Sequence, residues 1–183
     1  NCGNIPSAWK EAYITPLFKK GDKNKASNYR PVSLTAICSK LLEHIIHSHI
    51  ITHFDHHGIL SDAQHGFRKH RSCESQLIVT IQDIADSLNA GDQVDAILLD
   101  FSKAFEKVPH QRLLAKLSSY GVRGNLLDWV QDFLTNRTQS VVLEGQSSSR
   151  TEVTSGVPQG KVLGPLLFLV YINDMSDCVS STP

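Results

Sequence analysis

The chain has 183 residues, of which 40% are hydrophobic and 20% charged, and its formal net charge is zero. This length and composition are typical of one globular domain, or of two lobes that share a core, and they exclude disordered, collagen-like and disulfide-scaffold proteins. Four cysteines without a C-x-x-C pair exclude a zinc ribbon and favour a reducing compartment. Because no signal peptide or membrane-spanning stretch is visible, we expect an intracellular protein that is not secreted and contacts no membrane.

The charge is distributed unevenly along the chain. Residues 1–75 contain 10 Lys and Arg against 6 Asp and Glu, a net of +4, whereas residues 76–183 contain 8 against 12, a net of −4. A basic half suits phosphate binding and an acidic half suits metal binding, although such a bias is also common in proteins that bind neither. The only methionine is Met175, so residue 1 is not an initiator and we expect a fragment, a processed product or an incomplete gene model.

Four elements are predicted in the first half of the chain. Residues 12–18 indicate a short strand, and the lysine-rich stretch after it, with its Gly21-Asp22 turn signal, indicates a hairpin with a basic tip. A helix is expected from about residue 37 to residue 54, and a second over residues 74–89. The apolar residues of the first helix recur at 3–4 spacing and predict a buried stripe: Leu41, Leu42, Ile45, Ile46, Ile50 and Phe54.

The second half of the chain alternates strands and helices. Residues 96–99 are apolar and precede Asp100, a pattern that predicts a strand buried on both faces with a carboxylate at its end. Two short helices are expected over 109–120 and 126–134, a hairpin over 140–157, and a final apolar helix over 163–175. The predicted fold class is therefore α+β.

Asp100 is the first candidate for chemistry. An acid at the end of an apolar strand is costly to bury unless it is hydrogen-bonded, solvated or bound to a metal ion. From spacing alone, a metal ligand and an aspartate that caps the next turn are equally good interpretations. Residues 155–165 place three glycines and two prolines around Gln159, which allows the backbone to pass close to a flat ligand or simply to form turns.

Four ordered segments together resemble the reverse transcriptases of non-LTR (LINE-type, jockey-like) retrotransposons. They are NYRPVSL (28–34), AQHGFRKHRSCESQL (63–77), LLDFSKAFEKVPH (98–110) and SGVPQGKVLGPLLFLVYINDM (155–175). The similarity extends from about Trp9 to Asp177. It implies a right-hand polymerase with a fingers lobe over 1–92 and an incomplete palm lobe over 93–183, in which part of 120–155 packs on the fingers.

The resemblance also implies an activity and its partners. The complete protein would be an RNA-directed DNA polymerase that uses an RNA template, a DNA primer and deoxynucleoside triphosphates, in the nucleus and cytoplasm. Two Mg²⁺ ions, for which Mn²⁺ could substitute, would align the primer oxygen with the α-phosphate and neutralise charge on pyrophosphate. Asp100 matches the first palm metal ligand and catalytic acid, and the main-chain carbonyl of Phe101 would share a metal ion.

Nucleotide-binding residues follow from the same match. Phe105 matches the bulky residue that excludes a 2′-hydroxyl, although without the motif a core position is the better interpretation. Gln159 and Gly160 match the loop that contacts the incoming nucleotide and the template base. The guanidinium of Arg30 would grip the triphosphate in a bidentate fashion, with Lys19 or Lys20 as a second contact.

Three basic residues match positions along the template backbone: Arg68, Lys69 and Arg71. Their alternative interpretation is a solvated basic loop, and the two interpretations are nearly equal for Lys69.

The chain departs from the family pattern at several places. Glu106 replaces an aspartate, and Lys161 replaces a serine, where it would either clash with the template or pair with phosphate. The Tyr/Phe-x-Asp-Asp hairpin that supplies the other palm carboxylates does not occur in the 183 residues, and Asp174 is no substitute for it. We therefore expect this polypeptide to be inactive alone. The rival hypotheses are a catalytically inactive nucleic-acid-binding remnant and a decayed copy that is never made as folded protein.

Three histidines form a separate pattern. His49, His53 and His57 recur every four residues on the first predicted helix, a spacing that could present imidazoles to zinc. No cysteine or acid completes the site at comparable spacing. A polar shoulder beside the apolar stripe is therefore the favoured interpretation.

Overall fold

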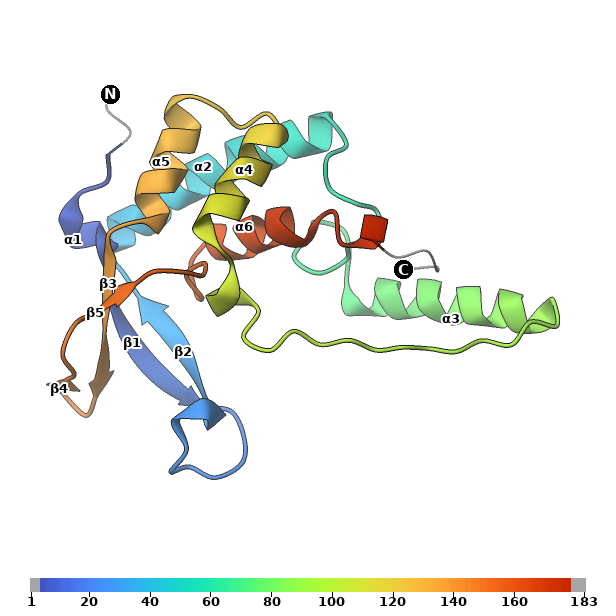
Figure 1. Cartoon of the computed structure of the whole chain (residues 1–183), viewed down its shortest axis with the longest axis horizontal. Coiled ribbons are helices and arrows are strands. Elements are labelled where there is room, and N and C mark those ends of the chain that lie inside the picture. The colour runs from blue at the N-terminus through green and yellow to red at the C-terminus, as the bar shows by residue number, and fades with distance from the viewer. Residues whose placement is uncertain (1–3, 179–183) are drawn as a thin grey trace.

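The computed structural model of the chain describes residues 4–178, which form a mixed α/β structure with a sheet at one end and packed helices beside it (Figure 1). The strands are β1 (Glu11–Phe18), β2 (Tyr29–Leu34), β3 (Arg137–Leu143), β4 (Gln146–Ser147) and β5 (Thr151–Val153). The helices are α1 (Ser7–Lys10), α2 (Ile37–His56), α3 (Cys73–Asn89), α4 (His110–Ser119), α5 (Asn125–Leu134) and α6 (Leu163–Ile172), and the 3-10 helices are Ala26–Asn28, Phe105–Lys107 and Ser176–Cys178.

The sheet joins two distant parts of the chain. β1 pairs antiparallel with β2 and parallel with β3, so that Tyr13 lies opposite Leu34 on one side and Ser140 on the other. β4 and β5 both pair antiparallel with β3. The two hairpins expected from sequence are confirmed, and the parallel β1–β3 contact merges them into one sheet.

The β1–β2 hairpin has the basic tip that the sequence predicts. Phe18 pairs with Tyr29 at the last register position, and the Lys19 amide donates to the Asn28 carbonyl at 2.9 Å. Gly21 has a φ of 91°, a conformation that glycine adopts without a steric penalty. The turn chemistry of the sequence therefore determines where this hairpin reverses.

One face of α2 packs into the main core, against α6. Its buried residues follow a 4-3-4-4 spacing: Ser39, Glu43, Ile46, Ile50 and Phe54. The wider stripe predicted for this helix is therefore wrong at two positions, because Leu41 is 62% exposed and Ile45 56% exposed. Both lie on the opposite side of the helix, about 140–180° around its axis from the centre of the buried face.

The strand predicted over residues 96–99, before Asp100, is absent from the structure, and this prediction is wrong for the described chain. The segment is extended and irregular, and Leu98 and Leu99 are 92% and 91% exposed. A strand requires a hydrogen-bonding neighbour, and the described residues place their sheet elsewhere, on β1 to β5. Figure 1 shows this segment (yellow-green) returning alongside α3, which projects from the rest of the molecule.

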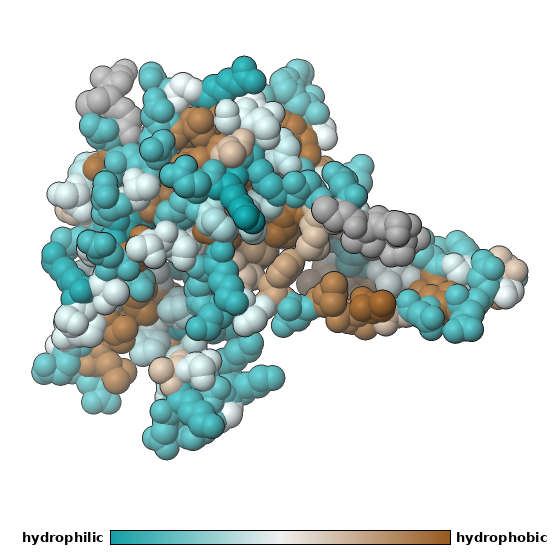
Figure 2. Space-filling model, viewed as in Figure 1, coloured by the Kyte–Doolittle hydropathy of each residue, from teal (hydrophilic) through white to brown (hydrophobic). Residues whose placement is uncertain are grey.

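Helix α3 begins and ends close to the predicted positions, but none of its residues is buried. Its start is stabilised by a capping box in which Ser72 and Ser75 bond reciprocally to each other's main chain. Figure 2 shows hydrophobic surface on this projecting part, where Leu77, Ile78 and Ile81 are each more than half exposed. Local helix signals alone therefore account for α3.

No helix within residues 4–178 combines the length and the apolar composition needed to cross a membrane.

Candidate functional site

The loop of residues 155–160 is the point at which three of the sequence motifs meet. On one side, the Ser33 amide of β2 donates to the Gln159 carbonyl at 3.3 Å. On the other side, the Val157 amide donates to the Phe105 carbonyl at 2.7 Å, and the Gly156 amide to the Val108 carbonyl at 2.9 Å. The loop therefore connects the segment that contains Arg30 with the segment that contains Phe105.

Two glycines, Gly156 in this loop and Gly164 in the first turn of α6, allow close approach of main chain to main chain. A Cβ atom at Gly156 would lie 2.7 Å from the Glu106 carbonyl oxygen, and one at Gly164 would lie 2.3 Å from the Pro158 carbonyl oxygen. Both distances are too short for any side chain. Gly160 differs, because its φ of 86° requires glycine while nothing lies closer than 3.6 Å to the position of a Cβ. The sequence predicts that glycines here make room for a ligand. In the structure, Gly156 and Gly164 make room for neighbouring main chain, at Glu106 and Pro158.

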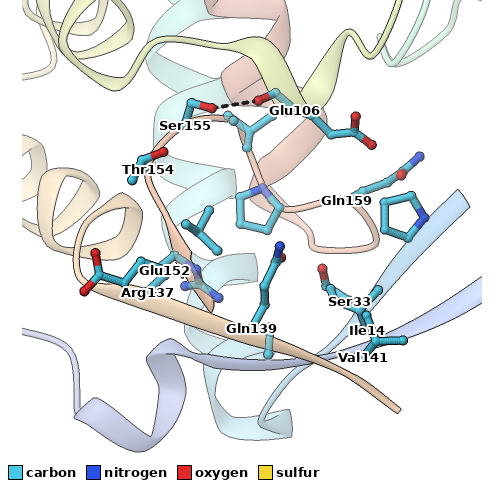
Figure 3. A pocket seen from close by; sticks show the side chains of 16 residues that line it. Ile14, Ser33, Glu106, Arg137, Gln139, Val141, Glu152, Thr154, Ser155 and Gln159 are labelled. Atoms are coloured by element: carbon cyan, nitrogen blue, oxygen red, sulfur yellow. Dashed lines mark hydrogen bonds between the residues drawn. The ribbon is translucent and has the colours of Figure 1, made fainter. Parts of the chain in front are cut away.

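A pocket of about 440 Å³ lies between this loop and the sheet. Its walls come from β1, β2 and β3, from Glu106, and from residues 152–159. Figure 3 shows Gln159 and Glu106 on one side of the pocket and Arg137 and Glu152 on the other. The pocket contains amide, hydroxyl and charged groups together, which is the kind of lining that a polar ligand requires.

Phe105 lies at the edge of the main core. Its ring stacks on Phe168 of α6, with centroids 4.8 Å apart and an interplanar angle of 19°, and Phe67 meets it edge-on at 5.9 Å. Phe101 also meets Phe168 edge-on, at 6.3 Å. The core interpretation of Phe105 thus has contacts in its favour, and a role against the sugar stays a prediction.

The cations of the hairpin are exposed. Lys19 and Lys20 lie just after β1, and Arg30 lies on β2 opposite Leu17. An exposed cation is not buried by folding, so its charge remains available to a phosphate in solution. The structure therefore leaves these three candidates accessible, on the strand pair that the Gln159 loop contacts.

The basic residues of the 63–77 segment are arranged differently from one another. Arg68 donates to the Ser61 carbonyl at 2.7 Å, and Arg71 donates to the Asp62 carboxylate at 2.6 Å. Lys69 is exposed. Two of the three proposed template contacts therefore have donors engaged in fixing their own loop.

Asp100 and Phe101 lie in the exposed extended segment that precedes Phe105. Nowhere in residues 4–178 do three or more His, Cys, Asp or Glu side chains come close enough to hold a metal ion. Asp100 alone does not form a site for two divalent ions, because each ion needs several oxygen ligands. The described residues therefore fit one ligand of such a site and not the whole of it.

The histidines of α2 make contacts of a different kind. His53 Nε2 lies 2.8 Å from the Tyr120 carbonyl oxygen, and the His53 and His57 rings meet edge-on at 4.5 Å. His53 thus ties α2 to the end of α4, and the polar-shoulder interpretation of the three histidines stays a prediction.

Lys161 lies in the interior, which corrects both alternatives stated for it above. Its side chain is completely buried, and its Nζ is 3.3 Å from Oε1 of Glu43, which is equally buried. Oε2 of Glu43 accepts the Val162 amide at 3.2 Å, and Ser39 Oγ donates to Oε1 at 3.0 Å. Lys161 therefore turns away from the nucleotide side of the loop and pairs with a carboxylate of α2.

A second buried cation lies next to this pair. Arg137 is 4% exposed, donates to the Phe133 carbonyl at 3.1 Å, and lies with Lys161 against the Phe133 ring. Burial, then repulsion from Arg137, lowers the pKa of Lys161 from its ordinary 10.5 to about 8, although the attraction of Glu43 opposes the shift. Glu43 and Arg137 belong to none of the sequence motifs, although Glu43 falls on the same helical face as Ile46 and Ile50.

Comparison with known proteins places the chain in a family. A family model described as reverse transcriptase (RNA-dependent DNA polymerase) matches residues 18–182, and the chain belongs to this family. The RNA-directed DNA polymerase from mobile element jockey of Drosophila melanogaster is 33% identical over 94% of the chain, and that of Drosophila funebris is 32% identical over 94%. The chain spans about a fifth of the length of these relatives, 19% in each case.

A more distant relative covers nearly the whole chain. The retrovirus-related Pol polyprotein from type-1 retrotransposable element R2 of Popillia japonica is 24% identical over 99% of it. The resemblance to non-LTR reverse transcriptases that rested on four motifs is thus confirmed.

Proposed function

We propose that this chain is the nucleotide-binding part of an RNA-directed DNA polymerase, which copies an RNA template onto a DNA primer from deoxynucleoside triphosphates. The observation that supports this most is the hydrogen bond between Ser33 and Gln159, 3.3 Å long. It joins two segments, 126 residues apart by their numbers, that the family resemblance independently identifies as nucleotide contacts. Their proximity is what a common substrate would require.

Each residue has a proposed task in binding. Arg30, with Lys19 or Lys20, would hold the triphosphate through charge-assisted hydrogen bonds. Gln159 would donate to the nucleotide, and Gly160 would leave room beside it. Phe105 would lie beneath the sugar, its ring held by the stack on Phe168.

The lobes are proposed as the resemblance implies them. Residues 1–92 would belong to the fingers and 93–183 to the palm, with β3 pairing with the fingers strand β1. Arg68, Lys69 and Arg71 would lie toward the template, where Lys69 has the most accessible charge. The location proposed for the whole protein is the nucleus and cytoplasm.

Asp100 is proposed as one carboxylate ligand of a divalent-metal site, with the Phe101 carbonyl beside it. Mg²⁺ is the proposed ion, because it prefers carboxylate and carbonyl oxygens in the presence of phosphates. When bound, such an ion neutralises phosphate charge. Residues 4–178 contain no cluster that would supply the other ligands. The role proposed for these residues is therefore to bind and orient the nucleotide.

The proposal is tested in a polymerase that contains this chain, by primer extension on an RNA template. Asp100→Asn is expected to abolish extension, by a factor of about a thousand or more, since an amide is a poor metal ligand. Asp95→Asn is the matched control, because Asp95 is an exposed acid of the same extended segment. Unchanged extension in Asp100→Asn, or equal loss in both variants, would overturn the metal-ligand role of Asp100, whereas no extension by the native protein would favour the inactive nucleic-acid-binding protein.

A further inference from the structure

The buried pair of Glu43 and Lys161 connects a helix of the first half of the chain to the loop that ends in Gln159 and Gly160. Glu43 accepts main-chain amides from Val162 at 3.2 Å and Leu163 at 3.5 Å, at the start of α6. The first amides of a helix have no partner within it, so this carboxylate both satisfies them and interacts favourably with the helix dipole. One side chain of α2 thus holds three consecutive residues, 161–163.

The loop before these residues has little freedom to move independently. Gly164 packs so closely on Pro158 that a Cβ there would lie 2.3 Å from the Pro158 carbonyl oxygen. Lys161 is two residues beyond Gln159, and its side chain has no exposed surface. A shift of Lys161 therefore changes the path of the main chain that holds Gln159 and Gly160 beside β2.

The charges of this cluster do not balance. Glu43 faces Lys161 and Arg137, and Lys40 of α2 is a further cation close enough to repel Lys161. Arg137 Nη2 and Lys161 Nζ are both buried without a well-formed hydrogen bond within residues 4–178, so charge attraction across 3.3 Å is what joins Lys161 to Glu43. The family resemblance leads one to expect a serine after Gln-Gly. A serine at position 161 would carry no charge and would be too short to reach the Glu43 carboxylate.

We propose that Lys161 is a positioning residue, which through its ion pair with Glu43 holds the main chain of Gln159 and Gly160 in the conformation that binds the incoming nucleotide. This inference rests on the proposed function, since it assigns to the same loop the binding of a deoxynucleoside triphosphate. Lys161 itself does not contact the nucleotide. Its charge is needed for the pairing, and so the affinity of the loop depends on the protonation of a buried amine.

The test is steady-state primer extension on an RNA template, with the polymerase that contains this chain, as a function of deoxynucleotide concentration and pH. Lys161→Met is expected to raise the KM for the deoxynucleotide by about tenfold at pH 7, with kcat and template affinity little changed. In the native enzyme the KM should rise above about pH 8, where Lys161 loses its proton. Lys161→Arg keeps the charge, so it should keep the low KM and remove this alkaline rise.

Two controls separate the possible failures. Lys10→Met breaks a partly buried ion pair elsewhere in the chain, that of Lys10 with Asp132 at 2.5 Å, and should leave the nucleotide KM unchanged. Arg30→Lys should raise the KM if the proposed function holds. A raised KM in Arg30→Lys, together with an unchanged KM and pH profile in Lys161→Met, would overturn the positioning role alone.

Other outcomes are equally decisive. No effect of any variant on the KM, or no extension at all, would overturn the proposed function and the inference with it. Hydrogen exchange provides a readout without activity. The amides of Val162 and Leu163 should exchange faster in Lys161→Met than in Lys10→Met, and equal protection of these amides in the two variants would contradict the proposal.

Discussion

Replacing Glu43 with glutamine should destabilise the fold far more than replacing Lys161 with methionine, although both substitutions break the same ion pair. The interior holds one carboxylate against two cations, Lys161 and Arg137. Glu43→Gln removes the only negative charge of this set and leaves the two cations facing each other. Lys161→Met leaves Glu43 with Ser39, the Val162 amide and the nearby Arg137.

The magnitudes follow from burial. Breaking a buried ion pair by removing one partner costs about 3–5 kcal/mol. For Glu43→Gln the cost of burying charged Lys161 has an upper limit, because Lys161 can lose its proton instead. Removing the proton from an amine with the ordinary pKa of 10.5 costs about 5 kcal/mol at pH 7. Lys161→Met should be no less stable than the native protein at pH 7, because burial and repulsion outweigh the attraction of Glu43 for the charged Lys161 by about 3 kcal/mol, and this variant removes the charge.

Urea unfolding followed by circular dichroism measures both variants, and pH adds a second comparison. The pKa of Lys161 is about 8 in the folded chain and near 10.5 in the unfolded chain, so between these values the unfolded chain binds more protons. The native protein should therefore gain up to about 3 kcal/mol over Lys161→Met as the pH rises through this window. Two results would refute the reasoning from the excess of buried positive charge. One is an equal loss of unfolding free energy in Glu43→Gln and Lys161→Met, and the other is a stability difference between the native protein and Lys161→Met that does not change with pH.

Two further predictions concern the nucleotide site. Arg30→Lys should weaken deoxynucleotide binding by about 1–3 kcal/mol through loss of the bidentate contact, and template affinity should stay constant in titrations; an equal fall in both would indicate unfolded fingers. Phe105→Val should raise ribonucleotide incorporation relative to deoxynucleotide incorporation, and it should also lower stability because the stack on Phe168 at 4.8 Å is lost. A lower stability with an unchanged ratio of the two incorporations would make Phe105 a core residue only.

Elements with strong local signals could be predicted from sequence. The hairpin turn at Gly21 and the helical spacing of α2 and α3 depend on neighbouring residues, and each element begins and ends near its expected position. The strand predicted over 96–99 is an expectation of this kind that is wrong. Its apolar residues satisfy a local pattern, but a strand exists only where another strand pairs with it.

Long-range contacts explain what else the sequence did not reveal. The parallel pairing of β1 with β3 joins residues 11–14 to residues 138–141, and no local pattern indicates which distant strand will be the neighbour. The same holds for Glu43 and Lys161, which lie 118 positions apart by their numbers. The helical spacing did place Glu43 on the buried face, and a buried acid requires a partner. That signal could have led to a search for a cation.

Counting basic residues therefore does not reveal how many cations are available to phosphates. Lys19, Lys20 and Arg30 are exposed on the hairpin, whereas Lys161 and Arg137 are buried beside Phe133. A buried cation has already lost its water and uses its charge within the protein, so it contributes to the shape of the site and not to phosphate affinity. In this chain the two kinds of cation meet across one loop, because β2 contacts Gln159 on the outside and Glu43 holds Lys161 on the inside. A substitution on either side should therefore change nucleotide binding, one by removing a phosphate contact and the other by moving the main chain.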